Sequence, residues 1–157
     1  MNPIVRKATL DDLPILLEFE QGVIETERPM NPALKDGHIN YYDIEKLITD
    51  VSSEVFVVEL NGEIVSSGYV QIKANSDFMK YDRQGYMGFM FVPPQHRGQG
   101  LNKLILDALT QWSREQGVVE LRLDVYASNP PAIRAYEKAG FEPLMMNMRK
   151  IISLEDN

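Results

Sequence analysis

The residues with the clearest chemical potential lie at a joint between a predicted strand and a predicted helix. Gln95-His96-Arg97-Gly98-Gln99-Gly100 follows two prolines and precedes apolar residues at helical spacing. The first N–H groups of a helix lack intrahelical partners and carry partial positive charge, and glycines before them let an anion reach the backbone. His96 and Arg97 add positive charge. The pattern predicts a phosphate or pyrophosphate cradle, with a glycine turn that only reverses the chain as the alternative.

Two common phosphate motifs do not fit this joint. The dinucleotide fingerprint needs a third glycine three residues after the second, but position 103 is Lys. The P-loop needs Gly-Lys-Ser/Thr after a four-residue gap, and the sequence lacks it. The phosphate hypothesis therefore needs a different pattern.

The elements that must position the joint alternate between strands and helices. Strands are predicted at 3–9, 54–60, 63–72, 85–92 and 120–127, with a closing strand or hairpin at 141–152. Helices are predicted at 9–25, 41–51, 101–116 and 128–141. This order predicts a mixed α/β sandwich in which helices cover a sheet.

Local patterns support several of these elements. Asn61-Gly62 between two β-rich runs is the preferred pair of a type I′ hairpin turn. The continuously apolar run at 85–92 is typical of a strand buried on both faces. Leu13, Leu16, Leu17 and Ile24 share one face of the first predicted helix.

Composition excludes several classes of function. The 157 residues, 44 % of them apolar, suit one globular domain spanning 1–157. Without Cys there is no disulfide, thiolate metal site or cysteine nucleophile, and His38 and His96 lack metal-ligand spacing, so we expect no metal. No apolar run has membrane-spanning length and the N-terminus shows no signal-peptide core, so we expect a cytoplasmic protein with no membrane partner.

The net charge of −7 argues against nucleic-acid binding, which needs a concentrated basic surface. It is compatible with a cationic partner, and also with an acidic surface that serves only solubility.

Two blocks of the sequence resemble one protein family. The pattern Gln/Arg-x-x-Gly-x-Gly/Ala at 95–100, after a strand and before an amphipathic helix, resembles the acetyl-CoA motif of the GNAT superfamily of N-acetyltransferases. The second block, 123–141, resembles the family's strand–Asn–helix–Tyr–Gly–Phe segment. Its matching residues are Asn129, Ala132, Tyr136, Gly140 and Phe141. The resemblance covers about residues 54–150 and implies a mixed, mostly antiparallel sheet with helices on both faces and a splayed strand pair.

The resemblance also implies how acetyl-CoA binds as the acetyl donor. Its pyrophosphate would lie on backbone N–H groups of the loop residues Arg97, Gly98, Gln99, Gly100, Leu101 and Asn102. Its pantetheine arm would pair with the strand backbone at Met90, Phe91 and Val92, because an amide-rich arm suits an unpaired strand edge. Asn129 would border the arm on the other side.

Tyr136 corresponds to the family's frequent general acid, which protonates the departing thiolate. The alternative is a packing residue, since Tyr136 shares helical spacing with Ala132, Ile133 and Ala139.

The general base departs from the family's pattern, because the strand at 85–92 contains no acid. Glu25 and Glu27 are the leading candidates for the catalytic carboxylate. Other candidates are Tyr126, Asp124 and a water held near Gly88, where a missing side chain would leave room for substrate. Each acid is alternatively a solvated surface charge.

The acceptor implied by the family is a primary amine of a small molecule or a peptide, attacking the thioester directly in a ternary complex. Residues 25–43, with several acids and Tyr41 and Tyr42, would suit such an amine, and the alternative is an ordinary polar loop. A non-catalytic acyl-CoA-binding regulatory module and a different acyl donor are the alternatives. Relatives are often dimers, which leaves a homodimer open.

Overall fold

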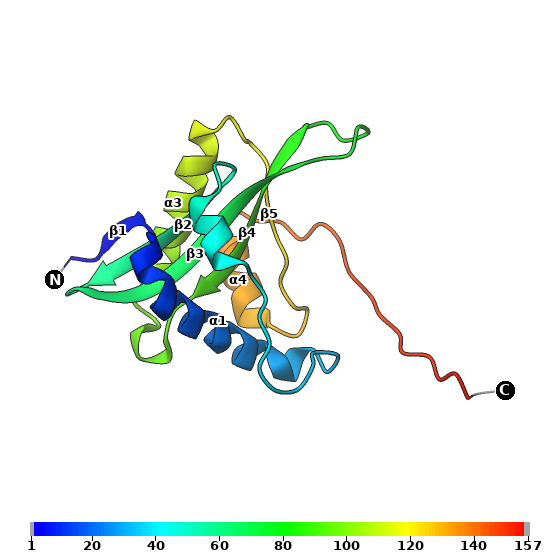
Figure 1. The fold of residues 1–157 in the computed structure, drawn as a ribbon. Helices are drawn as coiled ribbons and strands as arrows, with labels where there is room; N and C mark the ends of the chain where they lie inside the picture. The colour runs from blue at the N-terminus through cyan, green and yellow to red at the C-terminus, as the bar shows by residue number, and fades with distance from the viewer. Residues whose placement is uncertain (1, 156–157) are drawn as a thin grey trace. The chain divides into compact units, whose positions relative to one another are not determined.

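The computed structural model describes residues 2–155, which form two compact units with their boundary between Tyr126 and Ala127. The strands of the first unit are β1 (Ile4–Lys7), β2 (Ser53–Leu60), β3 (Glu63–Ala74), β4 (Arg83–Phe91) and β5 (Leu121–Leu123). Its α-helices are α1 (Leu13–Glu27), α2 (Ile44–Thr49) and α3 (Leu101–Glu115), with short 3-10 turns at Leu10–Asp12, Arg28–Met30 and Pro94–His96. The second unit holds α4 (Pro130–Lys138) (Figure 1).

The five strands form one sheet in the order β1-β2-β3-β4-β5. Neighbouring strands are antiparallel except for β4 and β5, which are parallel. The predicted fold class, a mixed and mostly antiparallel α/β fold, is confirmed.

Helices cover both faces of this sheet. A Cβ added at Gly68 in β3 would lie 2.5 Å from Ile105 of α3. The next residue, Tyr69, belongs to the core that α1 and α2 form. Because successive strand residues point to opposite faces, α3 lies on one face and α1 and α2 lie on the other (Figure 1).

The inward face of α1 differs partly from the predicted one. Leu16 and Ile24 are buried as expected, but Leu17 is 43 % exposed. Glu20, four residues from each of Leu16 and Ile24, is completely buried. A carboxylate therefore stands in the middle of the apolar stripe.

The predicted hairpin turn is confirmed, since Asn61 and Gly62 have φ of 55° and 80°. Both values match the left-handed backbone that a type I′ turn requires. The flanking hairpin between β3 and β4 is longer than predicted, because β3 extends to Ala74 and β4 begins at Arg83.

Other predicted elements also differ from the structure. The second helix begins at Ile44 instead of residue 41, because Asp43 is its N-cap and accepts the Lys46 N–H at 3.1 Å. The strand predicted at 120–127 is ordered as β5 only over Leu121–Leu123, where β4 pairs with it. The prediction of a closing strand or hairpin at 141–152 is wrong.

The segment that follows α4 contains no strand within the described residues. Its apolar residues include consecutive Leu144, Met145 and Met146, which neither alternate with polar residues nor are β-branched, and Ile151 and Ile152 come only near its end. Large apolar side chains remain exposed there, at Leu144, Met145, Met146, Met148, Ile151, Ile152 and Leu154. Within residues 2–155, no helix has both the length and the apolar character needed to cross a bilayer.

Candidate functional site

The loop between β4 and α3 has a backbone shaped for an anion. Gly98 and Gly100 have φ of 80° and 77°, in the left-handed region that favours glycine. A Cβ built at either glycine would meet no atom within 4 Å, so the space beside both is open. Gly100 is the N-cap of α3, whose first N–H groups have no intrahelical partner. The loop therefore presents accessible donors to open space.

Side chains at both ends of the loop fix this backbone. The Arg97 Nε–H donates to the Val92 carbonyl at 2.9 Å, which ties the loop back to the end of β4. Leu101 is only 4 % exposed, so its side chain anchors the first turn of α3 in the core. Gln99 is exposed. The loop donors are thus backbone groups, with side chains serving to hold them.

The end of β4 has an open edge. β5 pairs with β4 only from Gly85 to Met87, and among the described residues no strand continues the pairing beyond Met87. Met90 points toward α3, where its sulfur approaches the Gly68 site, and the Phe91 ring lies 5.0 Å from the Phe19 ring. On the side that faces β5, the backbone of Met90 and Phe91 is therefore unpaired with any strand among the described residues.

A β-bulge lies where β4 leaves β5. Ser67 of β3 faces Phe91, but Tyr69 faces Gly88, so β4 carries one extra residue between them. Phe89 adopts φ of 58°, and the Ser67 hydroxyl donates to its carbonyl at 3.1 Å. A bulge redirects backbone and side chains locally, and bulges are common beside active sites.

Aromatic side chains cover this bulge on the α1 face. The Tyr42 ring lies 5.1 Å from the Phe89 ring and 5.6 Å from the Tyr69 ring. A Cβ at Gly88 would lie 2.8 Å from the Tyr69 hydroxyl. The space expected for substrate at Gly88 is therefore filled by Tyr69.

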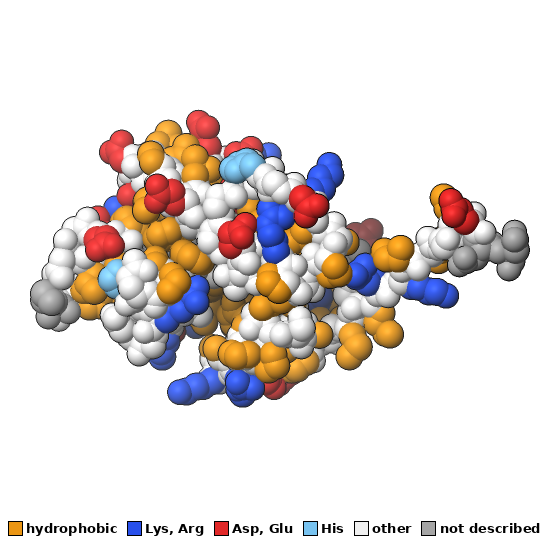
Figure 2. Space-filling model, turned by 90° about the horizontal axis from the view of Figure 1, so that it is seen from below, with side chains coloured by type: hydrophobic (Ala, Val, Ile, Leu, Met, Phe, Trp, Pro, Cys, Tyr) orange, Lys and Arg blue, Asp and Glu red, His pale blue; other side chains and the backbone are white. Residues whose placement is uncertain are grey.

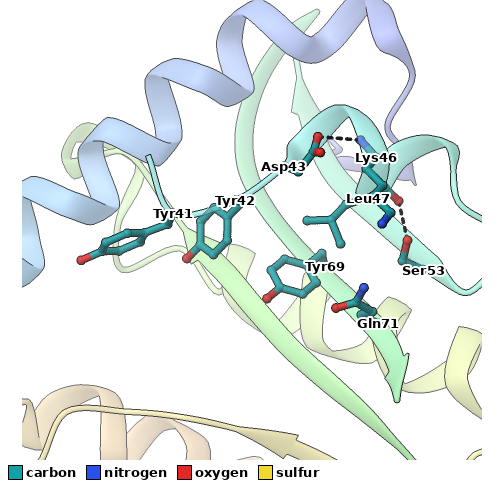
Figure 3. Close-up of a pocket in the computed structure, with 8 residues that line it drawn as sticks. All are labelled: Tyr41, Tyr42, Asp43, Lys46, Leu47, Ser53, Tyr69 and Gln71. Carbon is teal, nitrogen blue, oxygen red and sulfur yellow. Dashed lines mark hydrogen bonds between the residues drawn. The ribbon is translucent and has the colours of Figure 1, made fainter. Parts of the chain in front are cut away.

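A cavity of about 220 Å³ opens beside these rings. Its lining residues are Tyr41, Tyr42, Asp43, Lys46, Leu47, Ser53, Tyr69 and Gln71. Figure 3 shows the three tyrosine hydroxyls directed away from Asp43 and Lys46. The cavity thus has an aromatic end, next to the bulge, and a charged end at the start of α2.

Glu27 lies next to this aromatic end, whereas Glu25 does not. Burial raises the pKa of Glu27, and the nearby Tyr41 hydroxyl lowers it by a smaller amount. Burial, and secondly Glu27, raise the pKa of Tyr41. The buried Tyr41 hydroxyl makes no hydrogen bond of normal geometry within residues 2–155. The Glu25 side chain is 71 % exposed and pairs with Arg28 at 3.1 Å.

Two further contacts lie close to the point where the pairing of β4 with β5 ends. The Tyr86 hydroxyl donates to Asp124 at 2.7 Å, and burial, followed by that hydrogen bond, raises the pKa of Tyr86. The Asn31 side-chain amide donates to the Tyr126 hydroxyl at 2.9 Å. The segment after β5 is therefore connected to β4 and to the loop after α1.

Several of these residues were not among the predicted ones. Tyr69 and Tyr86 were unremarkable in the sequence, because which strand face carries them depends on tertiary packing. Glu20 carried a usable signal, its position on the apolar stripe of α1. Within the described part of the chain, no cluster of His, Asp and Glu could hold a metal ion.

Asn129 and Tyr136 belong to the second unit. Asn129 is the N-cap of α4 but makes no side-chain capping bond. The Tyr136 ring lies 5.9 Å from the Phe141 ring, and the Phe141 N–H donates to the Tyr136 carbonyl at 3.0 Å. Gly140, with φ of 100°, ends the helix as predicted.

Comparison with known proteins matches this arrangement to one family. Residues 21–141 match the sequence model of the Acetyltransferase (GNAT) family. The chain is 27 % identical over 145 residues to an aminoglycoside N(6′)-acetyltransferase type 1 of Stenotrophomonas maltophilia, covering 89 % of this chain and 86 % of that protein.

Solved structures share the fold. A mutant of the BH1408 protein of Bacillus halodurans has a TM-score of 0.84 at 20 % identity, over 95 % of this chain and 99 % of that one. A predicted acetyltransferase of Clostridium acetobutylicum, solved with acetyl-CoA, has a TM-score of 0.69 at 21 % identity, over 96 % of both chains. The chain belongs to the GNAT family of N-acetyltransferases, enzymes whose acetyl donor is acetyl-CoA.

Proposed function

We propose that this protein transfers the acetyl group of acetyl-CoA to a primary amine of a small molecule or peptide, by direct attack in a ternary complex. One observation carries the proposal: an open, left-handed glycine loop before α3 adjoins a strand end that has lost its β5 neighbour. The family match spans both compact units, which supports a single acetyltransferase domain over 1–157.

The donor side is built from backbone. N–H groups of Arg97 to Asn102 would hold the pyrophosphate, since the space beside Gly98 and Gly100 is open. The Arg97 N–H would first have to leave the Pro94 carbonyl, to which it donates at 3.3 Å. The open edge of β4, from Met90 to Val92, would pair with the amide groups of the pantetheine arm. Asn129, whose side chain is not used as a cap, would border that arm. When bound, acetyl-CoA supplies an acetyl thioester with a thiolate as leaving group.

The acceptor side is built from side chains. The tyrosine-lined cavity next to the bulge would take the amine-bearing substrate at its aromatic end, since the faces of aromatic rings favour a cation. Glu27 would take the proton from the ammonium, because its raised pKa makes it a stronger base than an ordinary Glu. Glu25 is the weaker candidate, since it is exposed and already paired with Arg28. Asp124, which accepts the Tyr86 hydroxyl proton in a hydrogen bond, would supply a second negative charge near Tyr69 of the cavity.

Tyr136 would donate the proton that the departing sulfur needs. It stands on α4 at the family's tyrosine position, four residues before Gly140. A phenol is a suitable acid for a thiolate, and general acids of this kind typically contribute about 10²–10⁴-fold in rate.

The expected partners follow from charge and from the relatives. The name of the Stenotrophomonas relative denotes transfer to an amine nitrogen. Among the coloured side chains in Figure 2, acidic and basic groups are interspersed with hydrophobic ones instead of forming one broad basic surface. This supports a small or peptide acceptor over nucleic acid. A cytoplasmic location and a homodimer stay predictions.

The proposed function is tested by thiol release from acetyl-CoA with a panel of primary amines. We expect saturable release that rises with pH as free amine accumulates. The chain has no Cys, so a thiol reagent detects only the product. Tight acetyl-CoA binding without release for every amine would point to a non-catalytic acyl-CoA-binding module. Propionyl- and succinyl-CoA in the same assay test the acyl donor.

Gly98→Asp and Gly100→Asp should each abolish acetyl-CoA binding. Each adds a Cβ at a left-handed backbone and a negative charge beside the pyrophosphate. Gln99→Ala is the matched control and should bind normally, because only its backbone takes part. Titration calorimetry measures all three, and unchanged affinity in both aspartate variants would refute the backbone cradle.

Tyr136→Phe should lower kcat by about 10²–10⁴-fold while acetyl-CoA affinity stays near normal. Tyr81→Phe, which removes a hydroxyl from an exposed tyrosine, is the control. Steady-state kinetics and calorimetry provide the two readouts. Wild-type turnover in Tyr136→Phe would make Tyr136 a packing residue.

Glu27→Gln should lower kcat by about 10²–10⁴-fold and remove the acid limb of the pH profile. Below its pKa, Glu27 is protonated and accepts no proton, so the wild-type rate falls as pH falls. Since burial raises that pKa, the limb should lie above the ordinary range of Glu. Glu25→Gln should keep kcat within a few-fold.

Two other outcomes for Glu27→Gln contradict the base. A raised acceptor KM at normal kcat would mean that Glu27 only attracts the ammonium. No change in either parameter would leave proton removal to an ordered water.

A further inference from the structure

We infer that Glu20 is a positioning residue for the acceptor side, acting through the backbone of Tyr41 and Tyr42. The inference rests on the proposed function, because it assigns those tyrosines to the acceptor wall. Glu20 does not line the cavity.

The contacts of Glu20 are specific. Its side chain is completely buried, and its Oε2 accepts the N–H groups of Tyr41 at 2.8 Å and Tyr42 at 2.7 Å. Its Oε1 is also buried and has no hydrogen-bond partner among residues 2–155. One carboxylate oxygen thus fixes two consecutive peptide groups, while the other remains unsatisfied.

A carboxylate at this position has a large desolvation cost. Leu16 and Ile24 flank it on the inward face of α1, where an apolar side chain would avoid the desolvation of a charged group. The compensation lies in the two hydrogen bonds to a charged acceptor, which are stronger than neutral ones. These bonds also fix the chain directly before α2, whose N-cap is Asp43.

The tyrosines transmit this constraint to the bulge. Tyr41 is held at its N–H by Glu20, and its hydroxyl lies near Glu27, two helical turns further along α1. The Tyr42 ring contacts Tyr69 and Phe89, the residues that cover and form the bulge. Moving the backbone at 41–42 would therefore reorient the aromatic end of the cavity and leave the α3 loop untouched.

Kinetics of three variants test the role. Glu20→Leu removes the acceptor oxygen, and Glu20→Asp keeps the charge but shortens its reach. Both should lower kcat/KM for the amine by about 10–100-fold, mainly through KM, the range expected for lost hydrogen bonds to a charged group. Acetyl-CoA affinity should stay normal. Glu20→Gln keeps one carbonyl oxygen and should stay close to wild type.

Glu18→Leu, the same change at an exposed position of α1, is the matched control and should change neither parameter. Thermal unfolding distinguishes a variant that does not fold from one that folds but positions the tyrosines wrongly. If Glu20→Leu does not fold, the kinetics of Glu20→Asp test the role instead. Wild-type kinetics in folded Glu20→Leu or Glu20→Asp would overturn the inference, as would equal losses in amine and acetyl-CoA affinity.

Amide hydrogen exchange tests the contact without activity. The Tyr41 and Tyr42 amides should be protected in wild type and exchange faster in Glu20→Asp. Unprotected amides in wild type would overturn the inference. If wild type acetylates no amine, the proposed function fails, and this measurement still decides whether Glu20 holds the two peptide groups.

Discussion

One extra residue in β4 governs the geometry around the site. The bulge puts Gly88 and Phe89 on the same face of the sheet, beneath Tyr69 and Tyr42, at the point where β5 pairing ends. It forces Phe89 into a left-handed backbone, which costs about 1–2 kcal/mol for a residue with a Cβ. Burial of the Phe89 ring, worth about 1.5–3 kcal/mol, offsets that strain. Strain held by surrounding packing is frequent where chemistry takes place.

The surfaces on the two sides of the bulge are formed by different chemical groups. On the α3 side, peptide groups and glycine torsions form the loop, and its side chains only anchor it. On the α1 side, tyrosine rings and polar side chains line a cavity, and Glu27 lies next to its aromatic end. Backbone donors suit a ligand part that never changes, such as a pyrophosphate. Side chains suit a partner whose shape differs from one enzyme to another.

Features set by local sequence were predictable, and those set by long-range packing were not. The glycine loop and the Asn61-Gly62 turn follow from torsions that few residues adopt, so residue type alone indicated them. The start of α2 was predicted three residues too early, because Asp43 caps the helix, while Tyr41 and Tyr42 before it are held by a distant carboxylate, Glu20. The prediction of substrate space at Gly88 was wrong because Tyr69, from the neighbouring strand, fills that space. Strand pairing likewise ended β5 at Leu123, although the alternating pattern continues beyond it.

The way the loop after α1 is fastened has an evolutionary consequence. Its carbonyls at Ile39, Lys35 and Gly37 accept bonds from two α1-side residues, Gln21 and Arg28, and it takes part in no sheet ladder. Its residues 35–38 are exposed, so substitutions there leave the strand pairing and the α3 joint intact. After gene duplication, descendants of such a chain can therefore diverge in the amine they modify while purifying selection keeps the donor half unchanged.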